Sequence, residues 1–306
     1  MGPTASGKSS LGIALAEQLK GEIINCDSVQ VYKDLQIATA KVPLDQRLGI
    51  PHHLLDFVPL NVNYTAVEWA AEALKKIGEI ESRGALPILV GGSGFYLRAL
   101  RQPFFPSPST NAQLRHRLNE IRLKRGADQL HRILRRLDPP TGAELHPRDW
   151  PRVQRAIEVL LQTGRPISEQ KQVRPAPHAS THKLRILALN PPRAELYRRI
   201  NSRTEAHFSA GLVEEVQDLL LRGAPATSNA LGAHGYRRVV EYLHGRRTLA
   251  SAIEETKLDI RHYAKRQLTW FRREPGVEWF EGFGDDKEVQ IQVRGAIRTG
   301  VSTKTA

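Results

Sequence analysis

A glycine-rich phosphate-loop motif at the start of the chain constrains the fold more than any other feature. Residues 2–9 read Gly-Pro-Thr-Ala-Ser-Gly-Lys-Ser and match G-x-x-x-x-G-K-[ST] in full. In this motif backbone N–H groups surround a phosphate, the lysine reaches it, and the last hydroxyl can hold Mg²⁺. A chance glycine-rich turn is the alternative, but apolar residues at helical spacing follow at once. The predicted phosphate site comprises Gly2, Pro3, Thr4, Ala5, Ser6, Gly7, Lys8 and Ser9, with Ser9 as the Mg²⁺ ligand.

The segment ahead of this loop departs from the usual pattern. A phosphate loop normally follows the carboxyl end of a central parallel strand, yet Gly2 is the second residue of this sequence. We therefore expect Met1 to be an internal methionine of a longer natural chain. A genuine start at Met1 would contradict that expectation.

Strand and helix signals alternate along the parts of the chain outside the arginine-rich middle. Apolar segments at 22–27, 86–90 and 184–189 are typical of buried strands, and an amphipathic helix is expected over 66–82. Such alternation predicts a parallel sheet with right-handed crossovers. The predicted fold class is α/β, with a P-loop NTPase-like parallel sheet core.

Changes in composition after Leu100 and near residue 177 divide the chain into three segments. Prolines interrupt residues 103–108, and an arginine-rich, helix-rich stretch follows to about residue 177. We interpret residues 1–104 as the first part of the core and 105–180 as an inserted helical subdomain. Residues 181–306 return to the core and add C-terminal helices, so the whole is mostly helical.

Two further expectations concern the last hundred residues. A long helix is predicted over roughly residues 249–272. The acidic stretch 274–288 is expected to be solvated.

The net charge of +13 is unevenly distributed. Residues 1–104 hold ten basic and ten acidic side chains, so the whole surplus lies in residues 105–306. A basic surface of this size favours a polyanionic partner, because lysine and arginine release counterions from phosphates. Solubility alone is the alternative explanation.

Composition excludes several classes of protein. The chain has 306 residues, 40% of them hydrophobic, but no apolar run of the roughly 18 to 20 residues that a membrane span requires. Its start has no secretory pattern, and the single cysteine, Cys26, cannot form an internal disulfide. No Cys/His spacing indicates a zinc site. We expect a soluble, cytoplasmic protein with no membrane partner.

Two polar features follow predicted strands. Asp27 ends the 22–27 segment and should lie beside the phosphate loop, where it could serve as a general base, a metal ligand or a helix cap. Gly91-Gly92-Ser93-Gly94 follows the 86–90 segment and could form a second strand-to-helix turn at the same cleft. A simple tight turn is equally compatible with that cluster.

Basic and aromatic residues are interleaved in the predicted long helix. Arg261, Lys265 and Arg272 recur near one face, while Tyr263 and Trp270 are seven residues apart. This pattern suits a phosphate backbone with unstacked bases. A solvated helix face with core aromatics explains it as well.

With these residues in view, the sequence resembles the bacterial tRNA dimethylallyltransferase family over essentially its whole length. The segments that carry the resemblance are residues 2–9, 27–32, 39–41, 51–56, 90–96 and 235–237, and Ala-Lys-Arg-Gln-Leu-Thr-Trp-Phe-Arg at 264–272. The last segment is specific, whereas a phosphate loop is generic. The family usually has threonine at the position of Ser93, and the zinc finger of its eukaryotic members is missing here, which favours a bacterial enzyme.

The resemblance implies transfer of a dimethylallyl group from its diphosphate to N6 of adenosine 37 of tRNA, with Mg²⁺ and release of pyrophosphate. By analogy Asp27 orients the adenine amine and takes its proton, and Ser93 is a second polar contact. Lys8, Thr4 and Arg237 would neutralise the diphosphate. The catalytic residues expected from the family are thus Asp27, Ser93 and Arg237.

The resemblance also implies that the anticodon stem-loop of tRNA is the partner and that the enzyme acts as a monomer. Its expected tRNA contacts are Asp27, Ser28, Val29, Gln30, Arg115, Pro151, Arg152, Val153, Gln154, Arg155, Lys265, Arg266, Gln267, Leu268, Thr269, Trp270, Phe271 and Arg272.

Two other functions stay open at this point. A P-loop kinase or adenylate prenyltransferase acting on a small nucleotide would leave the basic insertion without a purpose. A non-catalytic RNA-binding protein would leave the intact loop at Lys8 and Ser9 unexplained.

Overall fold

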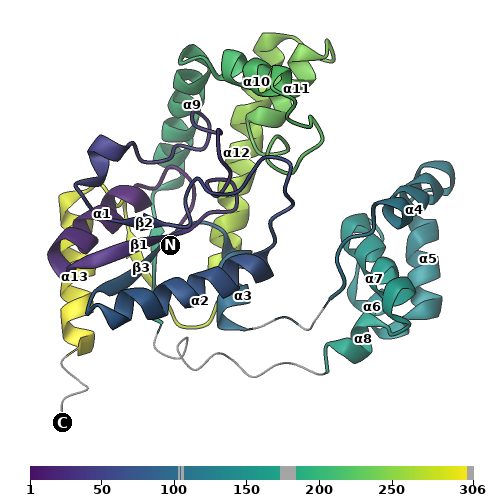
Figure 1. Cartoon of the computed structure of the whole chain (residues 1–306), viewed down its shortest axis with the longest axis horizontal. Coiled ribbons are helices and arrows are strands. Elements are labelled where there is room, and N and C mark those ends of the chain that lie inside the picture. The colour runs from purple at the N-terminus through teal and green to yellow at the C-terminus, as the bar shows by residue number, and fades with distance from the viewer. Residues whose placement is uncertain (103, 105–106, 173–183, 302–306) are drawn as a thin grey trace. The chain divides into compact units, whose positions relative to one another are not determined.

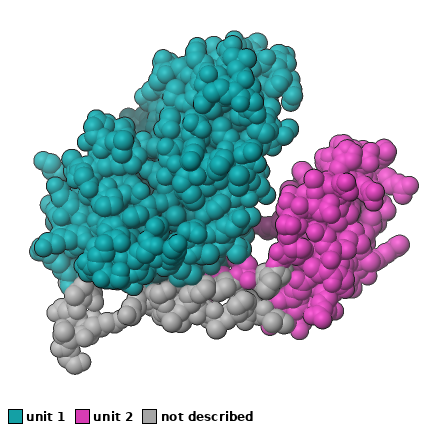
Figure 2. Space-filling view, viewed as in Figure 1, with its two compact units in different colours: residues 1–100, 180–306 teal, residues 101–179 magenta. Residues whose placement is uncertain are grey.

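The computed structural model describes residues 1–102, 104, 107–172 and 184–301. They form two compact units: unit 1 comprises residues 1–100 and 180–306, and unit 2 comprises residues 101–179 (Figure 2). Each unit has its own core and is described separately.

A three-stranded parallel sheet lies at the centre of unit 1 (Figure 1). Its strands are β1 (Gly21–Cys26), β2 (His52–His53) and β3 (Leu86–Gly91), in the order β2-β1-β3. In the β1–β3 register Ile23 lies opposite Ile88. The expected parallel arrangement is therefore confirmed.

Three helices precede, connect or follow these strands. They are α1 (Lys8–Leu19), α2 (Ala66–Ser82) and α3 (Gly94–Arg101). A capping box begins α2, because the Thr65 hydroxyl accepts from the Glu68 N–H while the Glu68 carboxylate accepts from the Thr65 N–H. A short 3₁₀ helix, Leu44–Arg47, lies between β1 and β2.

A second parallel pair in unit 1 consists of β4 (Ile186–Asn190) and β5 (Val277–Glu281). The expectation that residues 274–288 are solvated was wrong for this strand. Half-buried Trp279 and Phe280 lie opposite Ala188 and Leu189, and Glu278 pairs with Arg185 at 2.7 Å. The acidic composition of this stretch thus led to a wrong prediction for β5, whose apolar residues pair with β4.

A cavity of about 620 Å³ separates the two sheets. Within residues 1–102 and 184–301 no strand pairing joins β3 to β4. Met1 is one of the residues that line this cavity, and it is bound to β4: its amino group donates to the Leu187 carbonyl at 2.7 Å, and the Leu189 N–H donates to the Met1 carbonyl at 3.0 Å.

Helices complete unit 1. They are α9 (Arg193–Ser209), α10 (Leu212–Leu221), α11 (Tyr236–Leu243), α12 (Leu249–Phe271) and α13 (Lys287–Val301). The long helix expected near residues 249–272 is confirmed as α12, which begins at the Thr248 cap and packs against α9 and α11.

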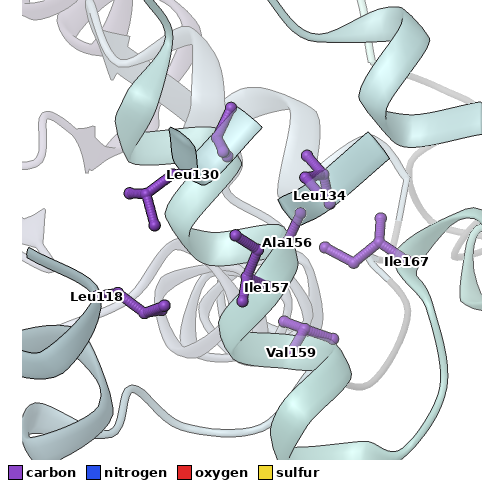
Figure 3. Close-up of a cluster of buried hydrophobic side chains, with 8 residues drawn as sticks. Leu118, Leu130, Leu134, Ala156, Ile157, Val159 and Ile167 are labelled. Atoms are coloured by element: carbon purple, nitrogen blue, oxygen red, sulfur yellow. The ribbon is translucent and has the colours of Figure 1, made fainter. Parts of the chain in front are cut away.

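Unit 2 is a helical bundle with its own core. It contains α4 (Ala112–Arg125), α5 (Ala127–Leu137), α6 (Pro139–Glu144), α7 (Trp150–Thr163) and α8 (Ile167–Gln170). Figure 3 shows the aliphatic side chains that meet between α4, α5, α7 and α8. The buried members are Leu118, Leu130, Leu134, Val153, Ala156, Ile157, Val159 and Ile167.

The predicted fold class, an α/β core with a helical insertion, is confirmed. Among the residues that the structure describes, no helix combines the length and the hydropathy needed to cross a bilayer.

Candidate active site

The loop at residues 2–9 adopts a conformation that turns its backbone toward a ligand. Ala5 (φ 61°) and Gly7 (φ 78°) have left-handed backbones, and α1 begins directly afterwards at Lys8. A side chain at Gly7 would place its Cβ 2.3 Å from an Asp285 carboxylate oxygen, so glycine is required. The N-terminus of α1 adds a positive dipole end at the same point.

Lys8 is held over this loop. Its ammonium donates to the Pro3 carbonyl at 2.6 Å. Burial lowers the pKa of Lys8 to about 8, although the Asp27 carboxylate opposes the shift. Phosphate oxygens placed in the loop would compete with Pro3 for this cation.

A polar cavity of about 530 Å³ opens beside the loop, at the carboxyl ends of β1 and β3. It lies where ligands bind in open α/β sheets. Its walls come from the loop (residues 4–10), the segment after β1 (27–30), residues 38–43, α9 (Arg203 and His207) and α12 (Ile260, Tyr263 and Gln267).

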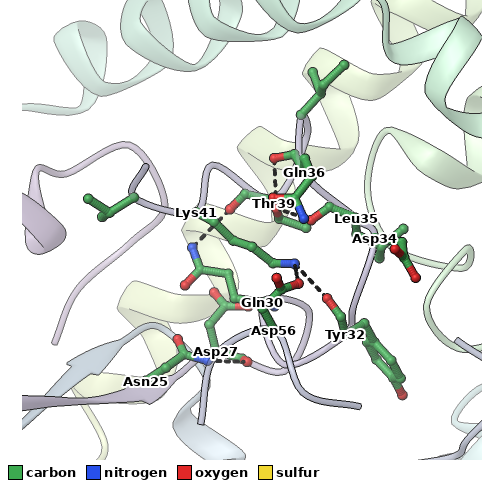
Figure 4. Close-up of polar contacts among 12 residues, drawn as sticks. Asn25, Asp27, Gln30, Tyr32, Asp34, Leu35, Gln36, Thr39, Lys41 and Asp56 are labelled. Carbon is green, nitrogen blue, oxygen red and sulfur yellow. Dashed lines mark hydrogen bonds and ion pairs between the residues drawn. The ribbon is translucent and has the colours of Figure 1, made fainter. Parts of the chain in front are cut away.

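Asp27 lines this cavity from the end of β1. Its Oδ1 accepts from the Val29 N–H at 2.9 Å and the Gln30 N–H at 3.3 Å, and Figure 4 shows Asp27 beside Gln30. Among the described residues no hydrogen bond to Oδ2 is present, so one carboxylate oxygen stays available for a ligand. The carboxylate therefore stabilises the turn after β1, where no helix begins, and also lies on the cavity wall.

Arg203 is a site residue that the sequence did not reveal. Its guanidinium donates to the Thr4 hydroxyl at 2.5 Å, and burial lowers its pKa while Asp27 opposes that shift. It lies on α9, one turn before His207, which also lines the cavity. Lys8, Arg203 and Asp27 thus meet around one cavity.

Arg237, expected to neutralise the diphosphate, is not among the residues that line the cavity, and its guanidinium pairs with Asp259 at 3.1 Å. Asp259 also binds Arg238 at 2.8 Å, so the two arginines share a carboxylate between α11 and α12. The role of Arg237 stays a prediction, while Arg203 lies directly beside the loop.

Ser93 lies behind the cavity wall instead of on it. Its hydroxyl accepts from the Ser28 N–H at 2.9 Å, and its N–H donates to the Cys26 carbonyl at 3.1 Å. These bonds attach the turn after β3 to the segment that carries Asp27. Ser93 thus helps to position residues 27 and 28, and its contact to the substrate stays a prediction.

Comparison with known proteins now adds to this geometry. The model of the IPP transferase family matches residues 30–274. A tRNA dimethylallyltransferase of Koribacter versatilis is 46% identical over 303 residues, 98% of this chain and 97% of that protein. One from Solibacter usitatus is 46% identical over 289 residues, 94% of each chain. The chain belongs to the IPP transferase family.

Solved structures agree with this assignment. The full-length tRNA isopentenylpyrophosphate transferase of Bacillus halodurans matches 99% of this chain and 96% of its own, with 35% identity and a TM-score of 0.73. A eukaryotic dimethylallyltransferase acting on tRNA matches 97% of this chain and 76% of its own, with 29% identity and a TM-score of 0.78.

In this IPP transferase some side chains of residues 264–272 point into the protein and others point to solvent. The Gln267 side chain is buried: its Oε1 accepts from the Thr4 N–H at 2.8 Å and its Nε2 donates to the Gly92 carbonyl at 2.9 Å. A Cβ at Gly92 would lie 2.1 Å from that Nε2. Gln267, expected as a tRNA contact, therefore connects the phosphate loop to the turn after β3.

Other side chains of the same segment also point inward. Phe271 is fully buried, and the Trp270 ring packs so closely on α3 that a Cβ at Gly94 would lie 2.1 Å from it. The Arg98 guanidinium stacks over that ring at 4.1 Å. The exposed members of the segment are Lys265, Arg266, Thr269 and Arg272, while Leu268 is half-buried.

Two of the expected tRNA residues of unit 2, Arg115 and Arg155, bind a buried carboxylate. Glu158 is fully buried, and its Oε2 accepts from Arg115 at 3.2 Å and from Arg155 at 2.8 Å. Burial raises the pKa of Glu158, but these hydrogen bonds outweigh it and lower the pKa overall. Val153 belongs to the core and Gln154 is bound to the Arg115 carbonyl, whereas Pro151 and Arg152 are exposed.

The remaining cavity residues had weak signals in the sequence. His234 and Tyr263 have ring centroids 5.0 Å apart, and burial lowers the pKa of His234 to about 4. Burial likewise lowers the pKa of His207 to about 4, so both imidazoles are neutral at pH 7. Only the four-residue spacing of Arg203 and His207 could have indicated a shared helix face.

Proposed function

We propose that the chain transfers a dimethylallyl group from dimethylallyl diphosphate to N6 of adenosine 37 of tRNA, releasing pyrophosphate. The observation that carries this proposal is the arrangement of one cavity. Lys8 and Arg203 lie at its phosphate loop, and the Asp27 carboxylate lies on its wall. The family assignment and the dimethylallyltransferase names of the relatives support the choice of reaction.

The cationic end suits the leaving group. As the allylic carbon–oxygen bond breaks, negative charge accumulates on the diphosphate. Lys8, Arg203 and the loop N–H groups supply positive charge and donors, and Thr4 is already held by Arg203. Fixed donors of this kind stabilise a developing charge without reorganisation.

The carboxylate suits the acceptor. A bond forms between N6 of adenine and the allylic carbon, and one N6 proton must leave. Asp27 can accept a hydrogen bond from the amine through Oδ2 and then take the proton. Because Val29 and Gln30 hold Oδ1, the carboxylate is fixed before substrate arrives.

Mg²⁺ fits the donors present. Ser9 lines the cavity at the phosphate loop, and its hydroxyl is the kind of oxygen ligand that Mg²⁺ prefers. The described residues hold no cluster of three acidic, histidine or cysteine side chains, so diphosphate oxygens and water would complete the shell. Bound there, the ion would neutralise charge on the diphosphate.

The protein surface that binds tRNA is expected to be basic. An adenine amine inside a stacked loop cannot reach Asp27, so the base must be extruded. Arg115 and Arg152 of unit 2 and Lys265, Arg266 and Arg272 of α12 are partly or fully exposed and can bind the flanking phosphates.

The test is to incubate the chain with Mg²⁺, dimethylallyl diphosphate and unmodified tRNA, and to analyse the nucleosides by mass spectrometry. Prenylated adenosine is expected, and tRNA with guanosine at position 37 should give none. The Asp27→Asn variant is the matched protein control. Phosphoryl transfer from ATP to a small nucleotide, with no prenylation of tRNA, would contradict the proposal.

A further inference from the structure

One wall of the polar cavity has no regular structure of its own. Residues 38–43 line the cavity, yet residues 33–43 contain no helix and no strand. Asp34 (φ 65°) and Ala40 (φ 50°) have left-handed backbones, which residues with a side chain rarely adopt. Contacts from outside the segment are therefore needed to hold it in this shape.

Two side chains from α10 and α11 supply such contacts. The Glu215 carboxylate accepts from the Gln36 N–H at 3.1 Å through Oε1 and from the Ile37 N–H at 2.9 Å through Oε2. The next N–H, that of Ala38, donates to the Tyr236 hydroxyl at 3.2 Å. This hydroxyl in turn donates to Glu215 Oε1 at 2.8 Å. One carboxylate and one phenol thus bind three successive backbone N–H groups.

The Glu215–Tyr236 pair acts on the cavity only from behind its wall. Neither residue is among the described residues that line the cavity, and Tyr236 is fully buried. Burial, together with the Glu215 carboxylate, raises the pKa of Tyr236, so the phenol keeps the proton that it donates. Any effect of the pair on a bound substrate must therefore pass through residues 36–38.

Further hydrogen bonds lead from this segment to the cavity carboxylate. The Gln30 side-chain amide donates to the Thr39 carbonyl at 2.9 Å and to the Ala40 carbonyl at 3.3 Å (Figure 4). The backbone N–H of Gln30 donates to Asp27 Oδ1 at 3.3 Å. Because one residue makes both sets of bonds, a shift of residues 38–40 would also displace a donor of the Asp27 carboxylate.

We propose that Glu215 and Tyr236 are positioning residues for prenyl transfer, which hold residues 36–38 and, through Gln30, orient the Asp27 carboxylate toward the adenine amine. The inference rests on the proposed function, in which Asp27 takes the amine proton. A displacement of about 1 Å at a reacting group can cost about a hundredfold in rate. Loss of the Glu215–Tyr236 pair should therefore slow the chemical step more than it weakens the binding of either substrate.

The experiment is a double-mutant cycle between Tyr236→Phe and Asp27→Asn, followed by single-turnover prenylation of tRNA. Tyr236→Phe removes only the hydroxyl, and it should slow the unaltered chain at least about tenfold. In the Asp27→Asn background it should slow the reaction less than about twofold, because residues that act through one group are not additive. The KM for dimethylallyl diphosphate and the Kd for tRNA should change less than about twofold.

Tyr242→Phe is the matched control, since it removes a hydroxyl from the same helix at a residue that does not line the cavity. It should change the rate less than about twofold in both backgrounds. Hydrogen exchange without substrate tests the contact itself: the amides of residues 36–38 should exchange at least about tenfold faster in Tyr236→Phe and at the original rate in Tyr242→Phe.

An equal loss of rate in the presence and absence of Asp27 would overturn the proposal, and so would an unchanged rate in Tyr236→Phe. If that variant does not fold, Glu215→Gln replaces it, because the amide keeps the shape but its nitrogen cannot accept from a backbone N–H. The absence of prenylation by the unaltered chain would contradict the proposed function itself. Normal prenylation with an unaffected Tyr236→Phe variant would contradict only the positioning role.

Discussion

Two cavities of similar size lie on either side of the phosphate loop and differ in almost every physical respect. The polar one, about 530 Å³, is lined by Lys8, Asp27 and Arg203, which hydrogen-bond to the surrounding protein. The other, about 620 Å³, is lined by aliphatic side chains, and Lys8 borders both. The charged groups of the polar cavity are thus held by hydrogen bonds, whereas the walls of the other cavity are held mainly by apolar packing.

The loop therefore depends on two kinds of support. On the polar side Gln267 and Arg203 hold Thr4, and on the apolar side Met1 is attached to β4. Changes on the polar side should alter chemistry with little effect on Tm, and changes on the apolar side should do the reverse. The following predictions test that division.

The largest effect is expected for Asp27→Asn. The amide keeps the shape but cannot take a proton, so kcat should fall by about 10²–10⁴-fold. Single-turnover prenylation measures this, with tRNA affinity and Tm as controls that should stay unchanged. Normal turnover in this variant would remove Asp27 from the mechanism.

A smaller loss is expected for Arg203→Ala, with Arg237→Ala as its matched control. Removing a cation and donor from the loop should lower kcat/KM for dimethylallyl diphosphate by about 10²–10³-fold. Arg237→Ala should change it only a fewfold, because that side chain pairs with Asp259 away from the cavity. A larger loss of kcat/KM in Arg237→Ala than in Arg203→Ala would assign the diphosphate contact to Arg237.

The pH dependence should reveal Lys8. With a pKa of about 8 in the free protein, Lys8 loses its charge as the pH rises through that value. The kcat/KM for dimethylallyl diphosphate should then fall up to about tenfold per pH unit above pH 8. Lys8→Arg keeps the charge, so its profile should stay flat to about pH 10; an identical falling limb in both proteins would assign the ionisation elsewhere.

Gln267→Glu should have an intermediate effect. A carboxylate cannot donate to the Gly92 carbonyl, so the connection between the loop and the turn after β3 is broken. We expect KM for dimethylallyl diphosphate to rise about tenfold while the Kd for tRNA is unchanged. A rise in the Kd for tRNA, with KM for dimethylallyl diphosphate unchanged, would show that Gln267 contacts tRNA.

The smallest effect is expected for Arg266→Ala. Loss of one phosphate contact should weaken tRNA binding severalfold and reduce the slope of log K against log salt by about 1. Binding titrations at several salt concentrations measure it. An unchanged slope would make Arg266 part of a merely solvated helix face.

Local motifs were predictable because their residues are neighbours in the chain. The phosphate loop, its helix and the position of Asp27 at a strand end follow from short segments with strong conformational preferences. The long helix α12 follows from its periodicity. The strand β5 was not predicted, because the acidic composition of residues 274–288 indicated a solvated stretch. Its two aromatic residues pair with residues 91 positions earlier in β4, which the local sequence does not reveal.

The phosphate loop, the α/β class, the basic C-terminal two-thirds and the family can all be predicted from the amino-acid sequence. Tertiary packing is needed to show that Arg203 binds Thr4 of the loop, that Gln267 points inward, and that an apolar space divides the sheets. Thr4 lies 199 positions from Arg203 and 263 from Gln267. Contacts over such separations depend on how whole elements pack, and local residue preferences carry no record of that packing.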